Sequence, residues 1–143
     1  MNLFLDTSAV VKLYNSEKET EELTSYISQP EMEQILISEI AKIEFRSALW
    51  KKFREKQLEE TDLNEVVDIF SSDTFYKIIP LSEVVIKTAI ELIGQYGRKG
   101  LRTLDSIQMA SILIAKSKNA DLTVITFDSV LKEVVSLEGI KTL

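Results

Sequence analysis

Four carboxylates stand at positions where an acidic side chain is locally unfavourable. Asp6 and Asp128 each end an apolar run. Glu44 interrupts an apolar helical stripe, and Asp105 lies in the first turn of a predicted apolar helix. If the fold brings these side chains together, mutual repulsion forces some of them to take up a proton unless a cation balances the charge. Carboxylate oxygens select hard cations, so the pattern predicts a Mg²⁺ or Mn²⁺ site.

Two residue types are missing from the chain, and their absence narrows the chemistry. The sequence contains no histidine and no cysteine. A Ser-His-Asp triad, a thiol nucleophile, a disulfide framework and a zinc finger are therefore excluded. An enzyme made from this chain must rely on carboxylates, lysine, arginine, hydroxyl groups or a metal ion.

Length and composition predict one globular domain over residues 1–143, with 45% apolar and 28% charged residues. There is no repeat, low-complexity tract or Pro/Gly/Ser-rich linker at which to divide it. No apolar stretch approaches the roughly 20 residues that a membrane span requires. The N-terminus also lacks the basic flank and long apolar segment of a secretory signal. We therefore expect a cytoplasmic protein with no membrane association.

Hydrophobic periodicity and turn residues predict strands that alternate with helices. The expected strands cover residues 2–6, 77–81, 122–127 and 140–143, while 31–38 is either the end of a strand or the beginning of the next helix. The expected helices cover residues 8–15, 18–28, 38–56, 61–72, 82–96, 103–118 and 129–137. This alternation without tight hairpins predicts an α/β fold, with a mainly parallel central sheet flanked by helices on both sides.

In open parallel sheets, ligands bind outside the carboxyl ends of the strands, where Asp6 and Asp128 are both expected. Each has a simpler interpretation as the N-cap of the following helix, a position that aspartate favours. For Asp128, Ser129 competes as the capping residue. Neither acid alone distinguishes a cap from a metal ligand.

Glu44 is the more informative acid, because Ala41 and Ala48 share its helix face and a glutamate among core residues needs a partner or a metal. Alternatively, it lies at the edge of this face and pairs with Lys51 or Lys52. Glu39 is a rival acid, although its position fits an ordinary first-turn residue near the helix dipole.

Asp105 has two interpretations of equal weight. An acid in the first turn of a helix complements the dipole and usually faces solvent, whereas the basic residues just before it would also suit an anionic substrate. Ser8 and Thr126 are candidates for supporting the site through hydrogen bonds, and their alternatives are a helix cap and an ordinary strand threonine.

The formal net charge of −6 argues against a broad surface for coating nucleic acid. It leaves room for a local basic rim around an acidic cleft. Lys12, Arg46 and Arg102 are the candidates for contacting substrate phosphates, although basic clusters are equally often solvated helix faces or loops.

Four segments taken together resemble the motifs of PIN-domain proteins, especially VapC-type toxins. They are residues 3–14, 38–44, 101–110 and 124–128, and they occur in the family's order and at similar spacing. Each motif alone is weak, but the ordered set covers nearly the whole chain. One departure is Gln108, where relatives often carry histidine.

The resemblance implies a three-layer sandwich in which Asp6, Glu44, Asp105 and Asp128 form the metal site of an endoribonuclease. One or two Mg²⁺ or Mn²⁺ ions would activate water against an RNA phosphodiester and stabilise the leaving oxygen. The resemblance also implies a homodimer, and a cognate antitoxin that wraps around the toxin and covers its cleft.

Three other functions compete with this hypothesis. An aspartyl-phosphate phosphatase would use Asp6 as the nucleophile, but it would want a second acid two residues later, where this chain has Ser8. A phospho-receiver normally has adjacent acids after its first strand, and this chain has none there. The third, also non-enzymatic like the receiver, is a PIN-like module that serves only for interaction or RNA binding.

Overall fold

The central feature of the fold is a five-stranded, fully parallel sheet with the strand order β3-β2-β1-β4-β5. The computed structural model describes residues 1–16 and 18–143. The strands are β1 (Asn2–Leu5), β2 (Gln34–Ser38), β3 (Tyr76–Ile79), β4 (Leu122–Ile125) and β5 (Lys141–Thr142). β1 therefore lies in the middle of the sheet, between strands that follow it far along the chain.

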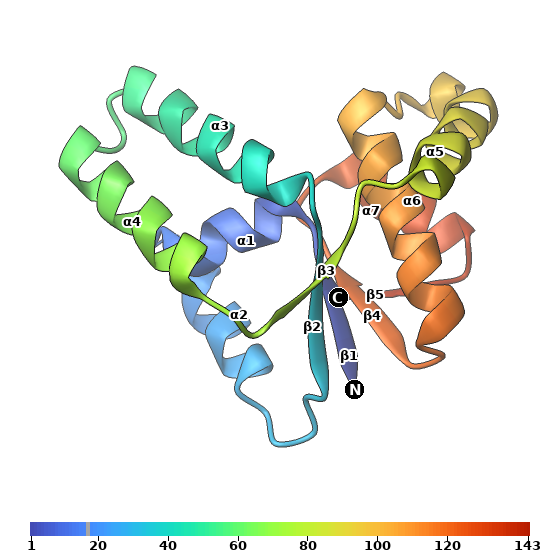
Figure 1. The fold of residues 1–143 in the computed structure, drawn as a ribbon, viewed down its shortest axis with the longest axis horizontal. Coiled ribbons are helices and arrows are strands. Elements are labelled where there is room, and N and C mark those ends of the chain that lie inside the picture. Colours follow the sequence, from blue (N-terminus) through green and yellow to red (C-terminus); the bar gives the residue numbers. More distant parts are fainter. Residues whose placement is uncertain (17) are drawn as a thin grey trace.

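Helices cover both faces of this sheet (Figure 1). One face carries α1 (Thr7–Tyr14), α2 (Thr20–Ile27), α3 (Ala41–Arg54) and α4 (Glu60–Ser72). The other carries α5 (Glu83–Tyr96), the 3-10 turn η1 (Gly97–Lys99), α6 (Thr103–Lys118) and α7 (Ser129–Leu137). The predicted α/β sandwich with a parallel sheet is confirmed. No helix in the described part of the chain is both long and apolar enough to cross a membrane.

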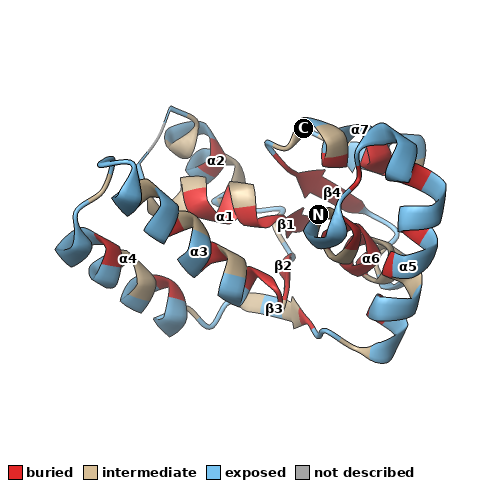
Figure 2. Cartoon of the chain, turned by 90° about the horizontal axis from the view of Figure 1, so that it is seen from above, coloured by how far each residue is buried: buried red, intermediate tan, exposed pale blue. Residues whose placement is uncertain are grey.

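Strand periodicity explains why the sheet separates two hydrophobic cores. Successive strand side chains point to opposite faces, so Leu3 and Leu5 pack against α1–α4, whereas Phe4 packs against α5–α7. In β2, Ile35 and Ile37 join the first core and Leu36 joins the second. The strands bury both faces, as their nearly continuous apolar composition requires. Figure 2 shows the buried residues along the strands and on the inner sides of the helices.

Several segments differ in detail from the sequence predictions. The uncertain segment 31–38 contains β2, and the helix predicted to begin at residue 38 begins at Ala41. Ile37 and Ile40 therefore precede the helix, and its buried centre consists of Ala41, Phe45 and Leu49. The last strand is shorter than predicted. These differences lie at the ends of elements, where capping and sheet pairing decide the boundary more than periodicity does.

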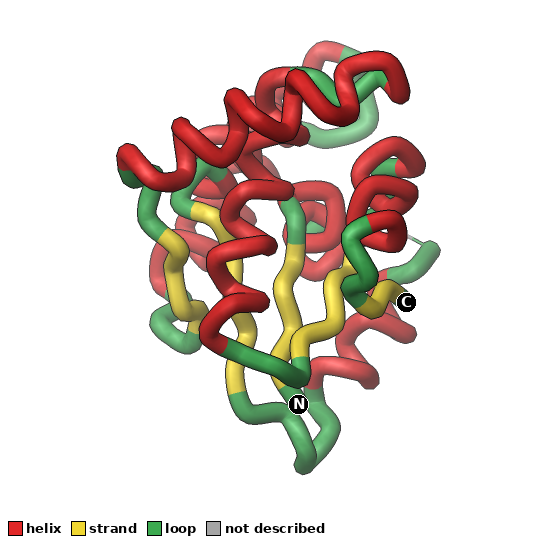
Figure 3. The backbone as a smooth tube through the Cα atoms, turned by 90° about the vertical axis from the view of Figure 1, so that its right-hand side faces the viewer, coloured by secondary structure: helices red, strands yellow, loops and turns green. Residues whose placement is uncertain are grey.

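The parallel register brings distant carboxyl ends of strands together. Leu5 at the end of β1 pairs with Ile125 at the end of β4, so the residues that follow both strands emerge side by side. Figure 3 shows the strands running together between the two helical layers. β2 also ends beside this edge, and α3 starts from it. Three of the predicted acids, Asp6, Glu44 and Asp128, therefore start from the same edge of the sheet.

Shortening Phe45 to alanine is expected to lower the free energy of unfolding by about 3–5 kcal/mol, because the fully buried ring packs against Tyr14 and Phe70. Urea denaturation measures the loss. Ile43→Ala, two residues earlier on α3, is the matched control, since Ile43 is 67% exposed and should cost under about 0.5 kcal/mol. Similar losses for both variants would contradict the assignment of Phe45 to the core.

Candidate active site

Asp6 is the most deeply buried of the four predicted acids, with only 4% of its surface exposed. It is the N-cap of α1, where its Oδ1 accepts a hydrogen bond from the Ala9 amide at 3.0 Å. Burial raises the pKa of Asp6 to about 6, and the charge of Asp128 acts in the same direction. The cap interpretation is therefore correct for its local geometry, but an ordinary cap is not buried beside another acid.

Two hydroxyl groups join Asp6 to the loop after β4. Ser8 Oγ donates to Asp6 Oδ1 at 2.6 Å and accepts from the Phe127 amide at 2.9 Å. Thr126 Oγ1 donates to Asp6 Oδ2 at 2.5 Å and accepts from the Asp128 amide at 3.0 Å. Both side chains therefore lie where supporting residues were predicted, and they fix the position of Asp128 relative to Asp6.

Asp128 and Asp105 both lie at helix N-termini. Asp128 is the N-cap of α7, with its Oδ1 accepting from the Leu131 amide at 2.8 Å. Asp105 is in the first turn of α6, where its Oδ2 accepts from the Arg102 amide at 3.1 Å. Burial raises the pKa of Asp105, and the charge of Asp128 adds to this effect, while the Arg102 amide opposes it. The two acids are thus electrostatic neighbours.

Glu44 is held by two hydrogen bonds at one oxygen. Thr7 Oγ1 donates to Glu44 Oε1 at 3.0 Å, and Gln108 Nε2 donates to the same oxygen at 2.9 Å. Burial raises the pKa of Glu44, as does the charge of Asp105, and the two hydrogen bonds lower it. Of the two lysines considered as alternative partners, Lys51 lies 4.0 Å from Glu55. The rival Glu39 instead accepts from the Leu81 amide at 3.0 Å.

The four acids are electrostatically linked in the order Asp6, Asp128, Asp105 and Glu44. Among the residues described, no three acidic side chains converge closely enough to enclose a metal ion by themselves. The donor chemistry nevertheless fits Mg²⁺ or Mn²⁺. Mg²⁺ is usually bound by only one or two carboxylates and keeps several water molecules, so it requires no closed protein cage.

A groove of about 430 Å³ beside these acids is lined by Glu44, Asp105, Arg102, Thr103 and Leu104. Of the three predicted phosphate contacts, Arg102 lines this groove together with Glu44 and Asp105. Its charge also lowers the pKa of Asp105, against the effect of burial. The groove therefore combines carboxylates with a guanidinium group at its rim.

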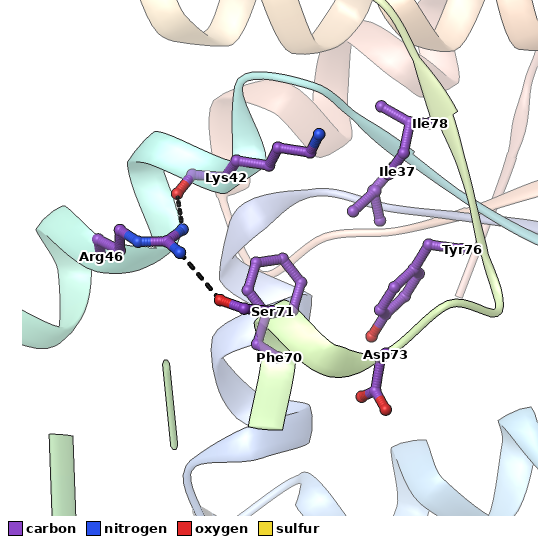
Figure 4. Close-up of a pocket in the computed structure, with 8 residues that line it drawn as sticks. All are labelled: Ile37, Lys42, Arg46, Phe70, Ser71, Asp73, Tyr76 and Ile78. Carbon is purple, nitrogen blue, oxygen red and sulfur yellow. Dashed lines mark hydrogen bonds between the residues drawn. The ribbon is translucent and has the colours of Figure 1, made fainter. Parts of the chain in front are cut away.

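The other two predicted phosphate contacts are engaged elsewhere. Lys12 Nζ lies 2.8 Å from Glu19 Oε2 and 4.8 Å from the centre of the Phe127 ring. Arg46 lies in a separate pocket that none of the four acids lines (Figure 4). There Arg46 donates to the Lys42 carbonyl at 2.6 Å and to Ser71 Oγ at 2.9 Å. Their phosphate roles remain predictions, with less geometric support than that of Arg102.

Sequence reasoning missed Thr7 and Gln108, the two residues that hold Glu44. Thr7 directly follows Asp6 as the first residue of α1, and nothing in the local sequence indicates its partner on α3. Gln108 is 3% exposed in a run of buried residues on α6, and a buried amide of this kind needs hydrogen-bond partners. The signal was a polar residue on the apolar side of a predicted helix.

The family model of the PIN domain matches residues 3–137. No curated protein matches the chain. Among solved structures, the chain is similar to VapBC2 from Rickettsia felis bound to a DNA fragment from its promoter, with 20% identity, a TM-score of 0.66 and coverage of 100% of this chain and 98% of the other.

Two further structures share the fold. VapC20 from Mycobacterium tuberculosis, a toxin that cleaves the sarcin-ricin loop, has 15% identity and a TM-score of 0.67, with 92% and 94% of the two chains covered. A toxin-antitoxin complex from Klebsiella pneumoniae has 19% identity and a TM-score of 0.59, with 96% and 94% covered. Because the family model spans nearly the whole chain and includes all four acids, the chain belongs to the PIN domain family.

Proposed function

We propose that the protein is a Mg²⁺- or Mn²⁺-dependent endoribonuclease, the toxin of a VapBC-type toxin-antitoxin module. The observation that carries the proposal is the burial of Asp6 beside Asp128, with no cationic side chain paired to Asp6 in the described part of the chain. A buried, ionised carboxylate near a second acid is costly unless a cation balances it. A divalent ion from solution is the simplest source of that balance.

Each acid has a role in this proposal. Asp6, Asp105 and Asp128 hold the cation directly or through water, and Glu44 either joins them or orients the attacking water. Hydrogen bonds from Ser8, Thr126 and the Ala9 amide occupy three of the roughly four acceptor positions of the Asp6 carboxylate. They fix its orientation and still leave room for one ligand. The bound ion supplies Lewis-acid activation of water and stabilisation of the leaving oxygen.

The proposed substrate is single-stranded or looped RNA, whose exposed backbone fits an open groove. Arg102 is the proposed phosphate contact at the rim. VapC20, which has the same fold, cleaves the sarcin-ricin loop. This similarity supports RNA as the class of substrate proposed for the present chain. An RNA substrate of this kind places the proposed activity in the cytoplasm.

The proposed partners are a cognate antitoxin and a second copy of the chain. The similar structure from Klebsiella pneumoniae is a toxin-antitoxin complex, which supports the first. The second is supported by three exposed isoleucines at helical spacing on α5, Ile86, Ile90 and Ile93, with exposures of 41, 67 and 38%. Contiguous apolar surface of this kind commonly marks a protein interface.

The competing function is a PIN-like module that binds RNA or protein without cleaving. The lack of three converging acids among the described residues favours it. An aspartyl-phosphate intermediate at Asp6 is the other alternative, and trapping an acyl phosphate would identify it. Both alternatives predict RNA that stays intact, so one cleavage experiment separates them from the proposed nuclease.

Replacing Asp6, Asp105 or Asp128 with asparagine is expected to reduce RNA cleavage by on the order of 100-fold or more, because each change removes a charge that holds the cation. The assay incubates purified protein with a pool of RNA in Mg²⁺, in Mn²⁺ and in EDTA. Cleavage should disappear in EDTA and return when Mg²⁺ is restored in excess.

Asp68→Asn is the matched control, since Asp68 is an exposed acid on α4 that lies outside the predicted site. It should cleave like the wild type. Equal cleavage by the wild type and Asp6→Asn would reveal a contaminating nuclease, and intact RNA with the wild type at every metal concentration would contradict the proposed function.

Without divalent metal, the pKa of Asp6 sets a pH dependence of stability. Its pKa rises from 3.8 to about 6 on folding. The stabilisation from its protonated form is therefore complete below about pH 3.8 and is lost as the pH rises through about 6, at most about 3 kcal/mol in total. Asp6→Asn lacks this loss, so it should be the more stable protein near neutral pH.

Urea unfolding of the wild type and Asp6→Asn in EDTA, at about pH 4 and about pH 8, measures this difference. Adding Mg²⁺ at the higher pH should stabilise the wild type and leave Asp6→Asn nearly unchanged, because ligands stabilise only the state that binds them. The same stability difference at both pH values would show that Asp6 ionises normally.

Arg102→Ala is expected to raise the KM for RNA several-fold with little change in kcat. It should also reduce the slope of the logarithm of the RNA-binding constant against the logarithm of the salt concentration by about one, the value for one phosphate contact. The measurement is a set of RNA-binding titrations across salt concentrations. Lys99→Ala is the control, since Lys99 pairs with Glu133 at 3.1 Å and does not line the groove. Identical salt slopes for wild type and Arg102→Ala would remove Arg102 from the substrate contacts.

A further inference from the structure

A closed hydrogen-bonded network of three side chains joins α1, α3 and α6. Gln108 Nε2 donates to Thr7 Oγ1 at 3.0 Å and to Glu44 Oε1 at 2.9 Å. Thr7 Oγ1 in turn donates to Glu44 Oε1 at 3.0 Å. The three residues are 37 to 101 positions apart in the sequence, so only the folded chain assembles the network.

The donors of this network converge on one oxygen of one carboxylate, either directly or through the Thr7 hydroxyl. Both N–H groups of the Gln108 amide are used, one on Glu44 and one on the hydroxyl that itself donates to Glu44. Glu44 Oε2 has no hydrogen-bond partner among the described residues, and Glu44 lines the groove beside Asp105. The network therefore fixes Oε1 and leaves Oε2 for a ligand in the groove.

The carbonyl oxygen of the same amide indicates that a glutamine at this position is not the most favourable choice for the stability of the fold. Gln108 Oε1 is buried and has no hydrogen-bond partner in the described part of the chain. An unpartnered buried acceptor destabilises a fold, and an apolar side chain of similar length would avoid that cost. The amide is therefore at this position for its donor groups.

We infer that Gln108 and Thr7 are positioning residues of the proposed metal site, which turn Glu44 Oε2 towards the bound cation or its coordinated water. This inference rests on the proposed function, and it assigns the network a role beyond joining three helices. Groups that orient a metal-binding side chain typically contribute 10- to 100-fold to metal affinity or activity.

Two near-isosteric substitutions test the inference. Gln108→Met keeps the length of the side chain and removes both donors, and Thr7→Val keeps its shape and removes the hydroxyl. Each is expected to weaken Mn²⁺ binding by about 10- to 100-fold and to lower kcat by a similar factor. The KM for RNA at saturating metal should stay unchanged, because neither residue is proposed to touch RNA. Calorimetric titration with Mn²⁺ alone gives the affinity without any cleavage reaction.

Two further variants separate positioning from general disturbance of the fold. Thr7→Ser keeps the hydroxyl group and should retain wild-type Mn²⁺ affinity. Ser111→Ala, one turn further along α6, removes a fully buried hydroxyl that bonds Ser38 instead of Glu44, and it should bind Mn²⁺ like the wild type. Melting temperatures in EDTA should be nearly equal for Gln108→Met and wild type, since the loss of two side-chain hydrogen bonds is offset by the removal of one buried, unpartnered acceptor.

The outcomes distinguish this inference from the proposed function. If the wild type binds Mn²⁺ and cleaves RNA, and Gln108→Met and Thr7→Val have the same Mn²⁺ affinity and cleavage rate as the wild type, the positioning role alone is overturned. Losses in Gln108→Met that are matched by Ser111→Ala, or that follow a lowered melting temperature, show a structural role and overturn it as well. Wild type that neither binds Mn²⁺ nor cleaves RNA overturns both proposals.

Discussion

The burial of the Asp6 carboxylate at the end of the central strand is the constraint on which the site depends. β1 lies between β2 and β4, so the residue that follows it is enclosed on both sides. An acid there raises its own pKa through lost hydration, and only nearby donors or a cation compensate. Hydroxyl and amide donors supply part of that compensation, and they come from the two segments that follow β1 and β4.

The same compensation organises the rest of the site. Ser8 and Thr126 each use one hydroxyl both to donate to Asp6 and to accept a backbone amide of the loop after β4. Asp128 is thereby fixed beside Asp6, and the helix that it caps is fixed with it. Thr7, the residue after Asp6, and Gln108 hold Glu44. The four acids are thus placed by hydroxyl and amide donors, with Arg102 contributing the nearby positive charge to Asp105.

Much of this arrangement follows from local sequence, and the part that does not is long-range. The apolar runs and their β-branched residues predicted the strands, and alternation with helices predicted the parallel sheet. Asp6 and Asp128 were identifiable because an acid directly after a buried strand is unusual. The N-terminal boundary of α3 was wrong by three residues, because Ser38 pairs in β2 with Ile79 and no local pattern reveals that pairing. Gln108 was missed as a partner of Glu44 because 64 residues separate them.

The position of β1 also has a consequence for how the protein forms during translation. β1 is synthesised well before its neighbour β4, which begins 120 residues after Asn2, at Leu122. Pairing between segments so distant in sequence forms late, because the intervening chain must first be made and ordered. The nascent chain therefore carries Asp6 without its hydrogen-bond partner Thr126 until 120 further residues have been added. The acidic cluster is therefore assembled only after the ribosome has made β4 and the two residues Thr126 and Asp128 that follow it.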